Sequence, residues 1–252
     1  MPNPVESYFS GRDGVRLAYW EVGEGRPLVL LPGLNGDARL WLGHGQAERI
    51  AARGYRVIMP DFRGFGRSAK PHDAAAYPLD VLTDDGLDLL DHLGVDDYDL
   101  GGYSLGGRIV VRMLVRGARP GRAVVAGQGL RQVLGVGGGA GSFMRRVLAG
   151  LGTFEPGSPE EQAEQRLRSN GTDPVALGHV LDSIAVTPVE AVGQIQVPTL
   201  VVMGADDERV VSVDQLVAAL PRGTRAMVPG DHSTAVSSPE LAAAIVDFLA
   251  RP

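Results

Sequence analysis

The stretch YDLGGYSLGGRIVVRM, residues 98–113, places a serine between two glycines where a short apolar run meets a helical pattern. From residue 105 onward, apolar residues recur at the spacing of one helix face: Leu105, Ile109, Val110 and Met113. A chain that turns directly from a strand into a helix leaves no room for side chains two positions from the apex, which accounts for Gly102 and Gly106. We therefore predict a strand, a tight turn at Ser104 and a helix, with the serine hydroxyl projecting from a strained backbone.

The rest of the chain repeats this alternation of short apolar runs with helical patterns. It predicts an α/β protein with a mostly parallel central sheet and helices on both faces. The expected strands lie at residues 15–21, 27–31, 55–59, 98–100, 122–126, 199–203 and 225–228. Between residues 130 and 193 the alternation stops, and a glycine cluster precedes several short helices with proline start signals. We predict a core of residues 1–129 and 194–252, and a helical cap of residues 130–193 over the carboxyl ends of the strands.

Composition excludes several classes of function. The chain has 252 residues, 44% hydrophobic and 21% charged, which is typical of a soluble globular protein. A formal charge of −6 argues against a nucleic-acid partner. The absence of cysteine excludes disulfides, thiolate metal sites and a cysteine nucleophile, and without paired histidines we expect no metal and no cofactor. No leader and no run of about 18 apolar residues is present, so we expect a cytoplasmic protein with no membrane partner.

A serine hydroxyl attacks only when a base takes its proton, and that base needs a carboxylate to orient it. Two later strand ends supply both groups: Asp206 and Asp207 follow the strand at 199–203, and His232 follows the strand at 225–228. Because the carboxyl ends of parallel strands meet at one edge of a sheet, we expect Ser104, a carboxylate and His232 to converge there. Either aspartate can serve at this point of the argument.

These features resemble the α/β-hydrolase superfamily, and its capped, esterase-like serine hydrolases in particular, over nearly the whole chain. The family's nucleophile motif falls on Ser104, its G-x-x-D on Asp207 and its late histidine on His232. Residues 61–68, DFRGFGRS, are similar to the family's D-x-x-G-x-G-x-S turn, in which we interpret Ser68 as a turn residue. The resemblance also implies an oxyanion hole formed by the backbone N–H groups of Leu34 and Leu105, although Pro-Gly stands where the family more often has His-Gly.

The resemblance implies cofactor-free cleavage of a small or medium carboxylic ester through an acyl-enzyme. We expect the substrate to contact Gly33, Asn35, Trp41, Tyr103, Phe143, Met144 and Leu148, several of them apolar. Relatives with the same triad cleave carbon–carbon bonds in keto-acids or make peracids. Cap arginines such as Arg131, Arg145 or Arg146 would favour carbon–carbon cleavage if they face the pocket, because they could hold the carboxylate of a keto-acid. A ligand receptor that keeps the fold without turnover is the alternative from a different class.

Overall fold

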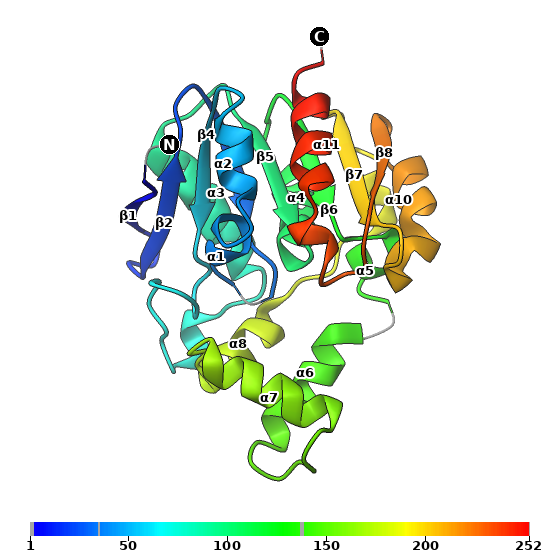
Figure 1. The fold of residues 1–252 in the computed structure, drawn as a ribbon. Coiled ribbons are helices and arrows are strands. Elements are labelled where there is room, and N and C mark those ends of the chain that lie inside the picture. The colour runs from blue at the N-terminus through cyan, green and yellow to red at the C-terminus, as the bar shows by residue number, and fades with distance from the viewer. Residues whose placement is uncertain (1–2, 35, 137–138, 252) are drawn as a thin grey trace.

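An eight-stranded sheet runs through the centre of the molecule in the computed structural model, which describes residues 3–34, 36–136 and 139–251 (Figure 1). Its strand order is β1-β2-β4-β3-β5-β6-β7-β8. The bounds are β1 (Val5–Ser10), β2 (Arg16–Val22), β3 (Arg26–Leu31), β4 (Tyr55–Pro60), β5 (Asp99–Tyr103), β6 (Ala123–Ala126), β7 (Thr199–Gly204) and β8 (Gly223–Val228). Strands β4, β3, β5, β6, β7 and β8 pair in parallel, whereas β1 and β2 are antiparallel to their neighbours. The predicted α/β class and mostly parallel sheet are confirmed.

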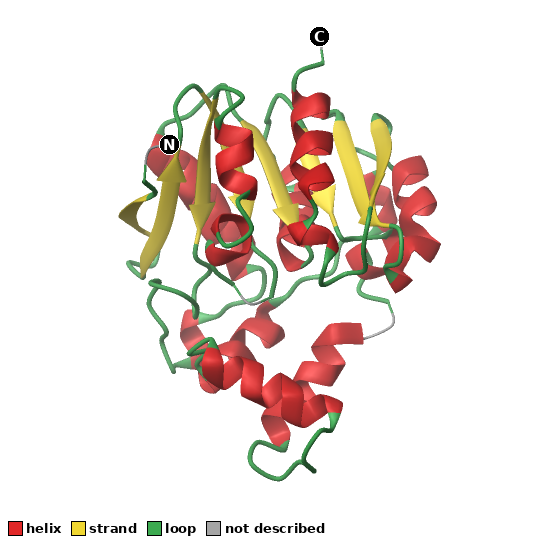
Figure 2. Cartoon of the chain, viewed as in Figure 1, coloured by secondary structure: helices red, strands yellow, loops and turns green. Residues whose placement is uncertain are grey.

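Helices cover both faces of this sheet, as predicted (Figure 2). One face carries α1 (Arg39–Leu42), α2 (Gln46–Ala51) and α11 (Pro239–Leu249). The other face carries α3 (Val81–Leu93), α4 (Leu105–Val115), α5 (Leu130–Val133), α9 (Val189–Val192) and α10 (Val213–Ala219). Short 3-10 turns lie at η1 (Ala74–Ala76), η2 (Glu208–Ser212) and η3 (Ala235–Ser237). In the described part of the chain, no helix has the length and hydropathy to cross a bilayer.

Burial explains why the central strands are continuous apolar runs. Residues Leu28–Leu31 of β3 and all of β5 and β7 are inaccessible to solvent, because helices pack on both of their faces. Strand β1 escaped the sequence analysis because its burial pattern is mixed, with charged and aromatic residues at a half-exposed sheet edge. Its register with β2, from Val5 opposite Glu21 to Ser10 opposite Arg16, extends the sheet by one strand away from the site described below.

The helical segment predicted for residues 130–193 contains α6 (Gly139–Ala149), α7 (Pro159–Ser169) and α8 (Pro174–Ser183) in addition to α5 and α9. In Figure 1, α6, α7 and α8 lie beyond the end of the sheet to which the parallel strands point. Ser158 caps α7 by accepting a hydrogen bond from the Glu161 amide, and Asp173 caps α8 in the same way. Contacts tie this segment to the core: the Asp80 amide donates to the Ser183 carbonyl at 2.7 Å. Its boundaries as a separate domain stay a prediction.

Three segments of the backbone meet where β5 turns into α4: β5 itself, the first turn of α4 and the end of β3. A Cβ atom placed on Gly102 would lie 2.4 Å from the Gly106 carbonyl carbon. A Cβ atom on Gly106 would lie 2.4 Å from the Leu31 carbonyl oxygen and 2.5 Å from that of Pro32, at the end of β3. Real Cβ atoms essentially never come this close, so both positions require glycine. The first turn of α4 is thereby packed directly against β5 and the end of β3.

This packing predicts the effect of Gly106→Ala. Helix propensity alone would make alanine more stable in α4 by about 1 kcal/mol, whereas the contact with two backbone carbonyls should lower the free energy of unfolding by about 3 kcal/mol or more. Urea unfolding measures the difference. Gly141→Ala in α6 is the control, because its Cβ would meet nothing within 4 Å; it should be neutral or stabilising. A stabilised Gly106→Ala protein would contradict this description of the turn.

Candidate active site

Ser104 is the residue at the apex of the turn, and its backbone is strained. It has φ 53° and ψ −117° and, with Asp80, is one of two non-glycine residues of positive φ in the described ranges. Such a conformation costs on the order of 1–3 kcal/mol. The Ser104 amide donates to the Ala126 carbonyl at the end of β6, which together with the glycine contacts holds the residue in place. Its Oγ lies 2.9 Å from His232 Nε2.

The second ring nitrogen of His232 faces a buried carboxylate. Nδ1 lies 2.7 Å from Asp207 Oδ2, and Asp207 is 1% exposed. Burial raises the pKa of Asp207, but hydrogen bonds from His232 and from the Arg209 amide outweigh it, so the pKa lies below its usual value. A carboxylate that accepts from Nδ1–H leaves Nε2 free to accept the proton of Ser104. The structure therefore brings together the three side chains that the sequence singled out.

Tyr103 and Gly127 hold the imidazole from behind. The Tyr103 hydroxyl donates to the His232 carbonyl at 2.8 Å, and the two rings lie 5.5 Å apart. Gly127, at φ 66°, leaves room for the imidazole, because a Cβ there would lie 3.2 Å from His232 Cε1. We predicted that Tyr103 contacts substrate; in the structure it is buried behind His232, where it positions the histidine.

The competing residues lie elsewhere. Asp206 is exposed, whereas Asp207 is buried against His232, which resolves the choice between them. Ser68 is buried in a turn, donating to the Asp61 carbonyl and accepting from the Ala18 amide, as a structural serine does. The other histidines are occupied away from Ser104 or exposed: His44, His72, His92 and His179.

The predicted oxyanion-hole residues lie beside the serine. Leu34 and Leu105 line the same cavity as Ser104, and a Cβ on Gly33 would lie 3.6 Å from Ser104 Cβ. Within the described residues, neither the Leu34 nor the Leu105 amide donates a backbone hydrogen bond. The first turn of α4 also presents its free N–H groups here, which favours developing negative charge. The role of these two amides in stabilising an oxyanion stays a prediction.

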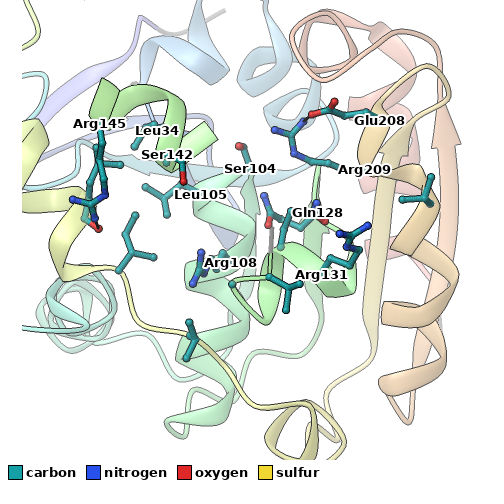
Figure 3. Close-up of a pocket in the computed structure, with 18 residues that line it drawn as sticks. Leu34, Ser104, Leu105, Arg108, Gln128, Arg131, Ser142, Arg145, Glu208 and Arg209 are labelled. Atoms are coloured by element: carbon teal, nitrogen blue, oxygen red, sulfur yellow. Dashed lines mark hydrogen bonds and ion pairs between the residues drawn. The ribbon is translucent and has the colours of Figure 1, made fainter. Parts of the chain in front are cut away.

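A cavity of about 510 Å³ opens in front of Ser104. Its walls come from the loop after β3, from α4, α5 and α6, and from the segments after β7 and α8 (Figure 3). Trp41 does not line the cavity. This residue is fully buried on the face of the sheet that carries α1, α2 and α11, where its Nε1 donates to the Leu31 carbonyl. Asn35, the remaining pocket candidate of that loop, lies outside the described residues.

The face of α6 that borders the cavity differs from the one predicted. Gly141, Ser142 and Arg145 line the cavity. The predicted contacts Phe143, Met144 and Leu148 do not line the cavity; they are partly buried and pack against the main hydrophobic core cluster. The amphipathic pattern correctly identified a packed face of this helix, but that face lies outside the cavity.

Four arginines border the cavity: Arg108, Arg131, Arg145 and Arg209. Two of them, Arg131 and Arg145, are among the arginines the sequence analysis named, while Arg146 pairs with Glu160 instead. Arg108 and the buried Gln128 were missed. The signal for Arg108 was available, because it stands four residues after Ser104 and so on the same face of α4. In the ranges described, no group of three or more acidic or histidine side chains could hold a metal ion.

Comparison with known proteins agrees with this fold. A family model for the alpha/beta hydrolase fold matches residues 26–126. The chain is 40% identical over 107 residues to a non-heme chloroperoxidase of Kitasatospora aureofaciens, covering 42% of this chain and 37% of the relative. It is 34% identical over 120 residues to a 2-hydroxymuconate semialdehyde hydrolase of Pseudomonas sp. (strain CF600), covering 46% and 42%. These matches therefore span less than half of the length of either curated relative.

Solved structures match over almost the whole length. A hydrolase from Pseudomonas aeruginosa PA01 superposes with a TM-score of 0.79 at 24% identity, covering 98% of both chains. The strand order of the sheet, the family model and this structural neighbour all indicate the same fold. The chain has the α/β-hydrolase fold, as its motifs predicted.

The geometry predicts how the serine reacts with an organophosphonate probe. Asp207→Asn should slow labelling of Ser104 by about 10³-fold or more, because an amide holds the wrong imidazole tautomer. The control is Asp206→Asn, which removes the same charge one residue away at an exposed position and should label at the wild-type rate. Intact-mass spectrometry against time measures both rates. Equal labelling of the two variants would contradict the pairing of Asp207 with His232.

Proposed function

We propose that the protein is a serine hydrolase that cleaves a carboxylic ester through an acyl-enzyme intermediate. The single observation that carries the proposal is the continuous chain from Ser104 Oγ to His232 Nε2 at 2.9 Å and from His232 Nδ1 to Asp207 Oδ2 at 2.7 Å. Ser104, at one end of this series of hydrogen bonds, borders a cavity large enough for a small organic molecule.

In the first half-reaction, Ser104 Oγ attacks the ester carbonyl carbon while His232 Nε2 takes the hydroxyl proton. The carbonyl oxygen becomes an oxyanion, to which the amides of Leu34 and Leu105 would donate. Collapse of the tetrahedral intermediate breaks the carbon–oxygen bond of the leaving alcohol, which receives the proton from His232. In the second half-reaction, His232 activates water, water attacks the acyl carbon, and the acid leaves as Ser104 regains its proton.

The identity of the nucleophile favours acyl substrates. Attack by a serine hydroxyl on a saturated carbon, as in an epoxide or haloalkane, would leave an ether, which water activated by histidine does not cleave. Attack on a carbonyl leaves an ester, which the same histidine can hydrolyse. The oriented triad also supports turnover over the alternative of a non-catalytic ligand receptor.

Carbon–carbon bond cleavage in a keto-acid is the second candidate on the same triad. The observation that favours it is the presence of Arg131 and Arg145 at the cavity, since a guanidinium can hold the carboxylate of such a substrate. Of the two, Arg145 already pairs with Asp182, so the support rests mainly on Arg131. The part of the chain that matches the 2-hydroxymuconate semialdehyde hydrolase includes no more than half of either protein, so we rank this activity below ester cleavage.

A panel of p-nitrophenyl esters of graded acyl length, run beside Ser104→Ala, tests the proposal. The wild-type protein should release p-nitrophenol with a preference for one range of chain lengths, and Ser104→Ala should reduce kcat by about 10³-fold or more. Ser68→Ala controls for the buried turn serine and should retain the wild-type rate in the folded fraction. No turnover on any ester, with no phosphonate label, would favour the receptor. Equal rates for wild type and Ser104→Ala would show that this serine is not the nucleophile.

A further inference from the structure

Arg108 is a cationic side chain at the cavity whose charge the protein leaves uncompensated. It stands on α4 one helical turn after Ser104, which places its Cα about 6 Å further along the helix axis. Its amide donates to the Ser104 carbonyl at 3.2 Å, and both side chains border the same cavity. Figure 3 shows Arg108 on the helix that begins beside Ser104.

Among the described residues, the guanidinium of Arg108 has one hydrogen-bond acceptor. Nη2 donates to the Ala185 carbonyl at 2.9 Å, while Nε is buried without a hydrogen-bond partner. Within the described ranges no carboxylate lies at ion-pair distance from it. Two nearby arginines differ: Arg112, on the same helix, pairs with Asp80, and Arg116, at the C-cap of that helix, pairs with Asp84 at 2.8 Å. Burial, with a smaller contribution from Arg112, lowers the pKa of Arg108, which reflects the cost of a charge held there without a partner.

The other charges at the cavity do not supply the missing anion. Arg145 pairs with Asp182, and Arg209 pairs with Asp207 and, more weakly, with Glu208. Glu208 is the one carboxylate among the described lining residues, and its side chain is 87% exposed. Arg131, from α5, makes no ion pair with a described residue and adds a second uncompensated positive charge. The cavity therefore has a cationic wall beside the nucleophile.

A half-buried guanidinium without an anionic partner is costly, and a ligand carboxylate lowers that cost by accepting charge-assisted hydrogen bonds. Arg108 borders the same cavity as Ser104, and its Nε–H is buried without a partner, so the guanidinium has donor capacity that the described residues do not use. We propose that the substrate carries a free carboxylate, that Arg108 binds it, and that Arg131 adds to the attraction. This inference rests on the proposed function and narrows it to anionic esters. It also corrects the expectation of an apolar pocket.

Matched ester pairs test the inference. Monoethyl esters of the C4 to C8 dicarboxylic acids are compared with ethyl esters of the monocarboxylic acids of equal length. Butanoyl esters of ω-hydroxy acids, compared with butyl butanoate, place the carboxylate on the alcohol side instead. Chromatography of the released acids gives kcat/KM. Wild type should prefer the anionic member of at least one pair, and Arg108→Met should lower kcat/KM for that ester by about 10- to 100-fold, with the neutral ester within about 3-fold.

Two further variants separate recognition from structure. Arg146→Met removes the same charge from an arginine outside the cavity, and should leave both esters within about 2-fold of wild type. Arg108→Lys keeps the charge without the planar fork, and should restore part of the preference. Equal losses on charged and neutral esters in Arg108→Met, with no recovery in Arg108→Lys, would assign Arg108 a structural role and overturn the inference.

A binding measurement keeps the inference distinct from the proposed function. Calorimetry compares monoethyl adipate binding to Ser104→Ala and to the double variant Ser104→Ala/Arg108→Met, in which no turnover is needed. Affinity about 10-fold weaker in the double variant would support carboxylate binding even if wild type cleaved no ester and the proposed function failed. Equal affinity in the two proteins, or binding to neither, would overturn the inference even if neutral esters were cleaved.

Discussion

The contact between the first turn of α4 and the ends of β3 and β5 is the constraint on which the rest of the site depends. Because Gly102 and Gly106 have no side chain, these three backbone segments approach to distances that a Cβ atom would not permit. This close packing holds Ser104 at positive φ and directs its Oγ to His232. It also brings the loop after β3 beside Ser104, with the Leu34 and Leu105 amides free of backbone partners in the described structure. The same packing thus places both the Ser104 hydroxyl and these two amides at the cavity.

The triad illustrates what a single sequence can predict. Each member lies just past a strand of the parallel sheet, and local turn chemistry marks each position: a glycine-flanked serine, an aspartate pair after β7 and a histidine after β8. Since parallel strands end at one edge, topology alone brings the three together. The choice of Asp207 over Asp206 required the family resemblance, and the burial of one carboxylate and the exposure of the other give its physical reason.

The residues that line the cavity could be predicted only in part from the sequence. An amphipathic pattern indicates that a helix face is buried but not what buries it, so Phe143, Met144 and Leu148 were assigned to the substrate although they pack against the hydrophobic core. Trp41 was also assigned to the substrate, but it is buried on the face of the sheet that carries α1, α2 and α11. Arg108 was overlooked because surface arginines are common on helices; its place at the cavity and the absence of a described carboxylate partner distinguish it from Arg112 and Arg116.

The central claim is that the hydroxyl of Ser104 forms a covalent bond with the acyl group during turnover. Rapid quenching of the wild-type protein with an activated ester, followed by peptide mass mapping, tests this most directly. If Ser104 is acylated, the peptide that contains it should gain the acyl mass within the first turnover and lose it once substrate is exhausted. Acylation of a different residue, or steady release of acid with no acylated peptide under conditions where hydrolysis of the acyl-enzyme limits the rate, would contradict it.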